Sequence, residues 1–431
     1  MRSEEARLDE AVGLAAAIDL EVVHAASAPV LRPRPATFLG KGKVEEIGGI
    51  LDQRDPRPGL VIVDHALSPV QHRNLEKEWN AKVLDRTALI LEIFGARART
   101  AEGRLQVELA HLSYQRSRLV RSWTHLERQR GGFGFLGGPG ESQIEADRRA
   151  LATRIDRLKE KLEHVRRMRG LQRAKRKRAP YPVVALVGYT NAGKSTLFNR
   201  MTHSAVDARD MLFATLDPTM RAVDLLSGQR IILSDTVGFI SDLPAQLVAA
   251  FRATLEEVIE ADLIIHVRDG AHPDSNAQRR DVITLLRDIG VGDDGAQPVI
   301  EALNKIDLLD DDARAKLQAT IGLSQGRAAF TIEEPARIAF SAVTGEGVGG
   351  LNDLIDALAT AERETVVVEL SAEDGKGRAW LHEMGDVRHE EIEGGLARLT
   401  VRLSEKSRGQ FRKAFPNAAI LPDPADVRRS A

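Results

Sequence analysis

Apolar and polar positions alternate in short blocks along the first part of the chain. The runs "DLEVVHA" (19–25) and "GLVIVDH" (59–65) are short and rich in β-branched residues, as strands are. After each of them, "KVEEIGGILDQ" (43–53) and "PVQHRNLEKEW" (69–79) carry apolar residues at helical spacing. The pattern predicts an N-terminal α/β domain over residues 1–85.

A pair of long helices is predicted next. Residues 86–123 place apolar side chains mostly at three- and four-residue steps, which predicts one long amphipathic helix. Residues 142–178 form a second helical stretch, which is more polar and strongly basic toward its end. A glycine-rich run separates the two stretches. We therefore expect an antiparallel helical arm over residues 86–180, with the glycine run at its tip.

Strand and helix patterns alternate throughout residues 181–364. The candidate strands are "PVVALVG", "RAVDL", "RIILSDT", "DLIIHVRD", "PVIEALNK" and "RIAFSA". Helical patterns lie between most of them, which predicts an α/β fold with a mostly parallel, doubly wound sheet. Residues 365–431 hold a strand, a helix, a hairpin at "VRHEEIEGGLARLTVRLS" and a final helix, so we expect a small α+β domain there.

Composition narrows the classes of partner and chemistry. The 431 residues include 61 Lys and Arg, 63 Asp and Glu, and no Cys. Because the charges nearly balance, a nucleic-acid surface must be local, and disulfide or thiolate chemistry is excluded. No apolar run approaches the about 20 residues that span a bilayer, and the first residues lack a signal-peptide pattern. We expect a monomeric cytoplasmic protein without membrane insertion and leave loose membrane association open.

The glycine run contains G-x-G-x-x-G at Gly132, Gly134 and Gly137. That spacing binds dinucleotides only between a strand and a helix, and here a basic helix precedes it. Dinucleotide binding is therefore disfavoured. Two interpretations remain, a flexible connector between helices and a loop that inserts into RNA, and the residues alone favour the connector.

The stretch "VVALVGYTNAGKSTLFN" carries the strongest chemical signal. Gly188-x4-Gly193-Lys194-Ser195 is the P-loop pattern, and it follows an apolar strand and opens a helix. Such a turn directs backbone N–H groups and a helix dipole at phosphate oxygens. Lys194 is expected to reach the β- and γ-phosphates, and the Ser195 hydroxyl to ligate Mg²⁺.

Two further polar sites follow apolar strands. In "LSDTVG", Asp235 is expected to hold Mg²⁺ through water and the Gly238 N–H to sense the γ-phosphate. In "LNKID", the Asp307 carboxylate can accept two hydrogen bonds from guanine, which adenine cannot donate. The site therefore predicts GTP rather than ATP.

Four more residues complete the predicted base site. Asn304 precedes Lys305, whose side chain can lie along the base plane, and "FSAVTGEG" places the N–H groups of Ser341 and Ala342 after the last strand. We expect these N–H groups to bind guanine O6.

Phe239 stands where Ras-like GTPases have a glutamine that orients the attacking water. Two interpretations can hold together: Phe239 is a core aromatic under a switch loop, and the catalytic group comes from elsewhere.

Motifs along most of the chain resemble those of the HflX-type GTPases, in the Obg–HflX group of GTPases related to translation factors. The motifs are "FLGKGKVEEI", "GPGESQIEADRR", "GYTNAGKSTLFN", "DMLFATLDPTMR", "LSDTVGFISDLP", "HPDSNAQ" and "NKID". The family usually has an arginine where Gly137 precedes Gly138-Pro139-Gly140, and a threonine in place of Ser142. These departures put an arginine contact at that loop in doubt.

The resemblance implies a mechanism and a partner. Thr215 would be the switch threonine that ligates Mg²⁺, a choice over Thr219 that spacing alone leaves open, and it would join Lys194 and Gly238 as the catalytic set. The partner would be the large (50S) ribosomal subunit with its 23S rRNA. Relatives bind it in the GTP state, split stalled or idle ribosomes and leave after hydrolysis to GDP. The glycine run would then insert into RNA, beside the basic stretch 164–178.

The residues expected to contact GTP are Gly188, Tyr189, Thr190, Asn191, Ala192, Gly193, Lys194, Ser195, Phe213, Ala214, Thr215, Leu216, Asp217, Asp235, Thr236, Val237, Gly238, Asn304, Lys305, Ile306, Asp307, Ser341, Ala342 and Val343. Asn191 lies where related GTPases without the glutamine hold an activating K⁺; the alternative is that its side chain braces the loop.

Two other functions compete with a GTPase. One is an ATP-dependent RNA remodeller of the helicase type, against which Asp307 argues. The other is an RNA-binding scaffold with an idle nucleotide site, against which the intact Lys194, Ser195 and Asp235 argue.

Overall fold

The computed structural model of the chain describes residues 2–129, 139–176, 181–204, 212–213, 215–216, 218–225, 230–241, 255, 257–291, 297–322, 331–360 and 363–422. The glycine run at its predicted arm tip, Ala214 and Asp217 lie outside the described residues.

A six-stranded sheet forms the centre of the molecule, and all six of its predicted strands are confirmed. They are β3 (Val183–Val187), β4 (Thr219–Asp224), β5 (Arg230–Asp235), β6 (Leu263–Asp269), β7 (Val299–Asn304) and β8 (Ala336–Ala339). The order is β4-β5-β3-β6-β7-β8, with β4 antiparallel to β5 and every other pair parallel. The predicted fold class is therefore confirmed, and the carboxyl ends of β3, β5 and β7 meet at one edge.

Helices cover both faces of this sheet because alternate strand residues point to opposite sides. The helical elements of this part are α7 (Lys194–Thr202), α9 (Ser275–Asp288), η1 (Ile306–Leu308), α10 (Asp311–Gly322) and α11 (Val348–Thr360). On one face, α7 and α11 bury Phe198 and Leu351 against Leu186 and its neighbours. On the other face, Leu286 of α9 belongs to a buried core that also contains Leu255 and Val258.

The N-terminal part is built from α1 (Glu4–Ala16), α2 (Lys41–Asp52), β1 (Leu60–Val63), α3 (Pro69–Trp79), β2 (Lys82–Asp85) and α4 (Arg86–Arg97). The strands pair only with each other, in parallel. The predicted strand at 19–25 is wrong: the segment is irregular and exposes Val22 and Val23. Apolar content alone does not make a strand where no neighbouring strand pairs with it. The short β2 and the helix α1 were not expected.

The predicted single helix over residues 86–123 is also wrong. The structure has two helices, α4 and α5 (Ala101–Gln129), separated by an extended residue at Ala98. The Thr100 hydroxyl accepts a hydrogen bond from the Gly103 N–H at 2.9 Å, so it caps a new helix start. A side-chain cap therefore interrupts a periodicity that by itself suggests continuity.

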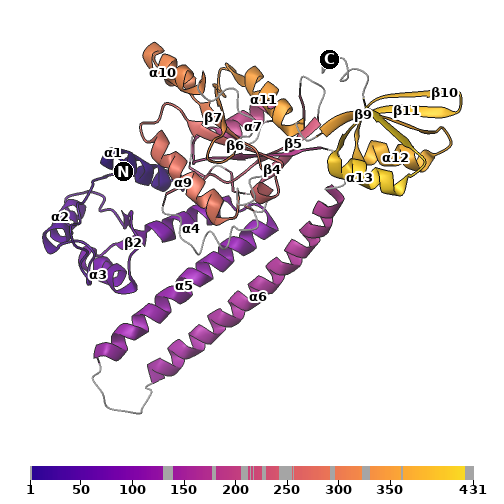
Figure 1. Cartoon of the computed structure of the whole chain (residues 1–431). Helices are drawn as coiled ribbons and strands as arrows, with labels where there is room; N and C mark the ends of the chain where they lie inside the picture. Colours follow the sequence, from indigo (N-terminus) through magenta and orange to yellow (C-terminus); the bar gives the residue numbers. More distant parts are fainter. Residues whose placement is uncertain are drawn as a thin grey trace.

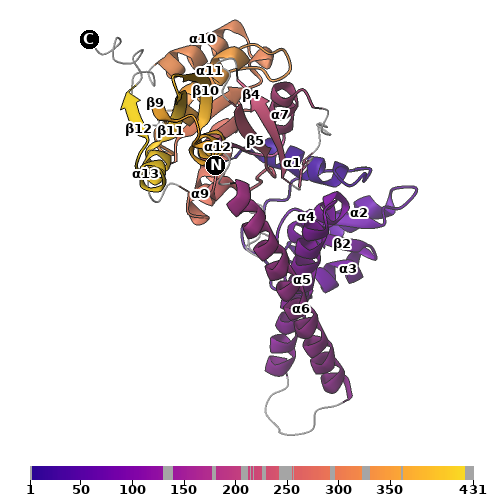
Figure 2. The same cartoon turned by 90° about the vertical axis from the view of Figure 1, so that its right-hand side faces the viewer.

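Helix α5 and helix α6 (Pro139–Arg176) form the arm. They pack through Leu112, Ile155 and Leu158. Figures 1 and 2 show both helices side by side, projecting away from the sheet-containing parts. Among the described residues, no helix combines the length and hydropathy needed to cross a membrane.

Helices α1 and α4 share one buried core with residues of the second face of the central sheet, such as Ala185 and Ile264. Leu89, Ile90 and Phe94 of α4 share one buried core with Phe213 and Phe239. The rings of Phe94 and Phe213 meet edge to face, with centroids 4.7 Å apart. The N-terminal helices therefore complete the core of the nucleotide domain.

The C-terminal part is the predicted α+β domain. Its antiparallel sheet has the order β10-β11-β9-β12, formed by β9 (Arg363–Ser371), β10 (Asp386–Glu393), β11 (Leu396–Ser404) and β12 (Ala419–Pro422). Helices α12 (Gly375–Met384) and α13 (Glu405–Ala414) are also present, and Phe411 of α13 is fully buried. Figure 1 shows this part on the opposite side of the central sheet from the N-terminal part.

A buried charge cluster lies between the strands. Glu301 of β7 is 1% exposed and accepts hydrogen bonds from Arg268 (2.7 Å), Arg279 (2.5 Å) and Arg337 (2.7 Å). Burial opposes ionisation, but the arginines outweigh it and lower the pKa of Glu301 to about 2. Burial lowers the pKa of the adjacent strand's His266 to about 3, against the attraction of Glu301, so His266 is neutral at pH 7.

We expect the sheet to lose stability between pH 7 and pH 5. In this range an unfolded histidine, with a pKa near 6.5, takes up a proton that folded His266 does not, so acid favours unfolding by up to about 1.4 kcal/mol per pH unit. Hydrogen exchange of the β6 amides, corrected for the intrinsic pH dependence, measures this slope. His266→Gln should flatten it, and an unchanged slope in that variant would contradict the assignment.

Candidate nucleotide-binding site

The P-loop joins β3 to α7 and needs glycine at two positions. Gly188 has φ +152° and Gly193 has φ +94°, which side chains rarely adopt. A Cβ at Gly188 would lie 2.1 Å from the Val267 carbonyl oxygen, and one at Gly193 would lie 2.1 Å from Asn304 Nδ2. The loop therefore passes directly against the ends of β6 and β7.

Lys194 lies in the floor of this loop. Its side chain is buried, and Nζ donates hydrogen bonds to the carbonyl oxygens of Gly188 at 3.1 Å and Tyr189 at 2.9 Å. Burial lowers the pKa of Lys194 to about 8, while the Asp235 carboxylate opposes that shift. Phosphate oxygens beside the ammonium group would favour its charged form.

Three oxygen-bearing side chains converge beside Lys194. Ser195 Oγ lies 2.7 Å from Asp235 Oδ2 and 2.9 Å from Thr215 Oγ1, and Thr215 donates to the same Oδ2 at 2.9 Å. Asp235 Oδ1 is buried and has no hydrogen-bond partner among the described residues. Burial raises the pKa of Asp235, which the nearby Lys194 opposes. Two hydroxyls and a carboxylate are the hard oxygen donors that Mg²⁺ prefers. The structure brings Thr215, and not Thr219, to this set.

Gly238 follows β5 and lies against the loop. A Cβ there would lie 2.9 Å from Thr190 Cα and 3.1 Å from Lys194 Nζ. The next residue pairs with the P-loop, since the Phe239 N–H donates to Gly188 O at 3.0 Å and Phe239 O accepts from the Thr190 N–H at 2.7 Å. The Phe239 ring is 2% exposed and belongs to the core shared with α4, so it is the core aromatic considered above.

Asn304 connects three parts of the site. Its Nδ2 donates to the Ala192 carbonyl and its Oδ1 accepts from the Ala342 N–H, both at 2.9 Å. The N–H groups of Ser341 and Ala342, which are expected to bind guanine O6, thus both have a partner within the described chain, since the Ser341 N–H donates to Glu346 O at 2.8 Å. The Val343 N–H makes no hydrogen bond within the described chain and is the remaining donor of this loop.

Asp307 lies in η1, one turn after β7. Its Oδ1 is buried and has no hydrogen-bond partner in the part of the chain that the structure describes. Such an oxygen is costly to leave unpaired. Guanine N1–H and N2–H₂ would satisfy it. Lys305 precedes η1 with φ +65°, and its Nζ lies 2.7 Å from Asp269 Oδ2.

The other residues that are expected to contact the nucleotide differ in their burial. Phe213, Leu216 and Val237 are buried in the core shared with α4, whereas Asn191 is exposed at φ +60°. Ile306 is buried in η1, and Thr236 Oγ1 donates to the Leu186 carbonyl at 2.6 Å.

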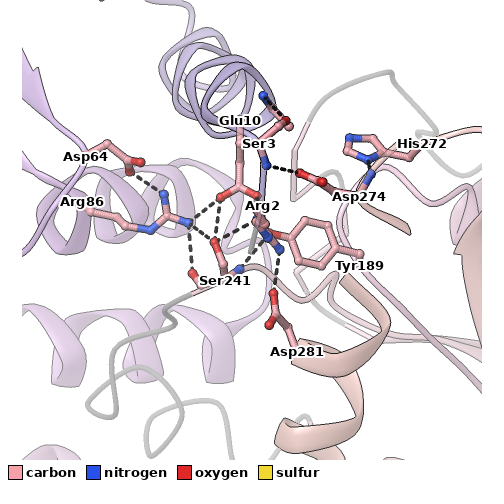
Figure 3. Close-up of polar contacts among 11 residues, drawn as sticks. Arg2, Ser3, Glu10, Asp64, Arg86, Tyr189, Ser241, His272, Asp274 and Asp281 are labelled. Carbon is pink, nitrogen blue, oxygen red and sulfur yellow. Dashed lines mark hydrogen bonds and ion pairs between the residues drawn. The ribbon is translucent and has the colours of Figure 1, made fainter. Parts of the chain in front are cut away.

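Sequence reasoning missed one set of contacts at this site. The hydroxyl of Tyr189, inside the P-loop, hydrogen-bonds to Glu10 of α1 and accepts the Ser241 N–H at 2.8 Å. Figure 3 shows these side chains meeting with Arg86. Because they come from distant segments, no local pattern could have connected them.

Asp307→Asn should weaken GTP binding by at least about tenfold, since each charge-assisted hydrogen bond to guanine contributes roughly 1–3 kcal/mol. The amide can instead donate to the 2-oxo group of xanthine, so affinity for XTP should rise relative to GTP. Titration with fluorescent GTP and XTP analogues measures both. The exposed Asp311 supplies a control, Asp311→Asn, that should change neither; unchanged GTP affinity in Asp307→Asn would remove Asp307 from base recognition.

Comparisons with known proteins agree with this geometry. Residues 5–95 match a family described as GTP-binding GTPase N-terminal, residues 97–176 one described as GTP-binding GTPase middle region, and residues 183–305 one described as 50S ribosome-binding GTPase. In a solved structure described as the SsGBP and GDP complex, the similarity has a TM-score of 0.50 at 27% identity, covering 83% of this chain and 97% of that one.

Two curated relatives are similar over nearly the whole chain. The GTPase HflX of Magnetococcus marinus is 50% identical over 376 residues, which cover 87% of this chain and 83% of the relative. That of Escherichia coli is 42% identical over 397 residues, covering 92% and 89%. The resemblance in the motifs is confirmed, and GTP hydrolysis with it: the chain belongs to the HflX family of GTPases.

Proposed function

We propose that this GTPase binds the large ribosomal subunit in its GTP state, through its arm and N-terminal part, and separates the two subunits of stalled or idle ribosomes. The single observation that carries the proposal is the core that α4 shares with Phe213 and Phe239, because it joins the arm-bearing part of the chain to the nucleotide site. The description of the family matched by residues 183–305 supports the choice of the 50S subunit.

The arm offers a surface suited to RNA. Along the described part of α6, most of the exposed charged side chains are basic, and they include Arg148, Arg149, Arg157, Lys159 and Lys161. Basic side chains contact phosphates without reading sequence, which suits a structured rRNA. The glycine run would extend this contact at the tip, where glycines permit close approach to RNA.

The proposed switch uses residues that already lie around the phosphate site. Ser195, Thr215 and, through water, Asp235 would hold Mg²⁺, which supplies charge neutralisation between the β- and γ-phosphates. Lys194 binds phosphate oxygens, and the Gly238 N–H contacts the γ-phosphate. Loss of that phosphate removes the contacts of Thr215 and Gly238, so the conformation that binds the ribosome is populated only with GTP.

We expect the protein to sediment with purified 50S subunits in a non-hydrolysable GTP analogue and about tenfold less in GDP, a ratio within the usual range of allosteric coupling. Equal sedimentation in both nucleotides would exclude the switch. Shortening residues 131–140 should reduce ribosome splitting while GTP affinity stays unchanged. Full splitting by this variant would leave the glycine run as a plain connector.

Asn191 gives the free enzyme a way to hydrolyse GTP without the glutamine. Its side chain makes no hydrogen bond with any described residue, so nothing there supports the alternative of a loop brace. An exposed amide oxygen at this point of the P-loop can hold K⁺ near the β–γ bridge. Positive charge there stabilises the transition state of phosphoryl transfer.

Single-turnover hydrolysis should therefore be faster in K⁺ than in Na⁺, and Asn191→Ala should abolish the difference. The 50S subunit should accelerate hydrolysis much further by ordering the segments that carry Thr215 and Gly238. Equal rates in the two salts would eliminate the K⁺ site. If the free enzyme hydrolyses GTP at about 1 s⁻¹ or faster, which is the lower end of the turnover rates of kinases, another catalytic group must exist.

A further inference from the structure

A polar cluster lies where the N-terminal part meets the nucleotide site, beside the core shared with α4 (Figure 3). It contains side chains from the start of the chain, from the end of β1, from the first residue of α4, from the P-loop, from the segment after Gly238 and from α9. They are Arg2, Glu10, Asp64, Arg86, Tyr189, Ser241 and Asp281.

Glu10 is the centre of this cluster. It is mostly buried and accepts hydrogen bonds from Arg2 Nη1 at 2.7 Å, Arg86 Nη2 at 2.6 Å and Ser241 Oγ at 2.9 Å, as well as from the Tyr189 hydroxyl. Burial favours the neutral acid, but the Tyr189 hydrogen bond and the charges of Arg86 and Arg2 outweigh it, so the pKa of Glu10 lies below its usual value. Glu10 is therefore ionised at neutral pH.

In the described part of the chain, Ser241 is held by residues from distant segments. Its N–H donates to the Tyr189 hydroxyl at 2.8 Å, and its carbonyl and Oγ each lie 3.0 Å from Arg86 Nη2. Three residues earlier, Gly238 lies against the P-loop, and Phe239 is paired to it. The segment from Gly238 to Ser241 is thus anchored by the P-loop at one end and by α1 and α4 at the other.

We propose that Glu10 and Arg86 are positioning residues for GTP hydrolysis. They fix Ser241 and thereby hold the Gly238 N–H where it meets the γ-phosphate. An N–H that stabilises developing charge is effective only if it is placed before the reaction begins. A buried ion pair is weak evidence for a role in stability. The contacts of Glu10 and Arg86 with Ser241 point instead to a role in orienting the segment from Gly238 to Ser241.

The cluster also continues into the arm. Asp85, next to Arg86, caps α4 through the Ala88 N–H at 2.8 Å. It accepts hydrogen bonds from the Tyr114 hydroxyl at 2.9 Å and from Arg118 Nη1 at 3.2 Å, both on α5. A partner that shifts α5 would therefore displace Arg86 and, through it, Ser241.

The test compares Glu10→Gln, Ser241→Ala and the double variant in single-turnover GTP hydrolysis without ribosomes. Each single change should slow hydrolysis by about tenfold, the effect of one hydrogen bond to a charged group. Affinity for GDP should stay within about twofold, because GDP has no γ-phosphate for Gly238 to contact. The double variant should be no slower than the slower single variant, since both break one connection.

Glu108→Gln is the matched control, because it removes the carboxylate partner of Arg154 in the arm and lies outside the cluster. It should leave hydrolysis unchanged. Unchanged rates in Glu10→Gln and Ser241→Ala would overturn the proposal. So would a parallel loss of GDP affinity and hydrolysis, which marks a merely structural role. If Glu10→Gln unfolds, Ser241→Ala alone decides. None of these measurements contains ribosomes. A negative result would therefore not count against ribosome binding.

Discussion

The buried core that α4 shares with the nucleotide domain is the interaction on which the other features depend. Leu89, Ile90 and Phe94 of α4 share one buried core with residues of the central sheet, of α9 and of the segment that carries Phe239. Burying apolar area is strongly favourable but has no preferred direction. The apolar core can therefore join the N-terminal part to the nucleotide domain without determining their relative orientation. The hydrogen bonds of Glu10 and Arg86, which are directional and lie beside the same core, fix this orientation.

Much of the nucleotide site could be predicted because its signals are local. The P-loop needs glycine at positions 188 and 193, because larger residues there would collide with Val267 and Asn304. This requirement can be recognised from a short stretch of sequence. Each motif also follows an apolar strand, so the parallel sheet places the motifs at one edge without further information. The inner strands β3, β6 and β7 were recognisable because strands buried on both faces are almost continuously apolar.

The failed predictions depend on contacts that the local pattern does not contain. Residues 19–25 look like a strand but find no partner strand, and Thr100 caps a helix inside an unbroken periodicity. Glu10 and Ser241 are 231 positions apart, and only the folded chain shows that they touch.

The absence of the glutamine and the position of Phe239 have one physical explanation. A glutamine at this position would need a polar, water-facing setting, whereas here the side chain enters the core shared with α4. Phe239 therefore strengthens the contact with the N-terminal part, but its side chain cannot orient the attacking water. Residues outside the nucleotide domain can then help to orient the segment that carries Gly238. Glu10 and Arg86 hydrogen-bond to Ser241, which lies on the segment that Phe239 anchors.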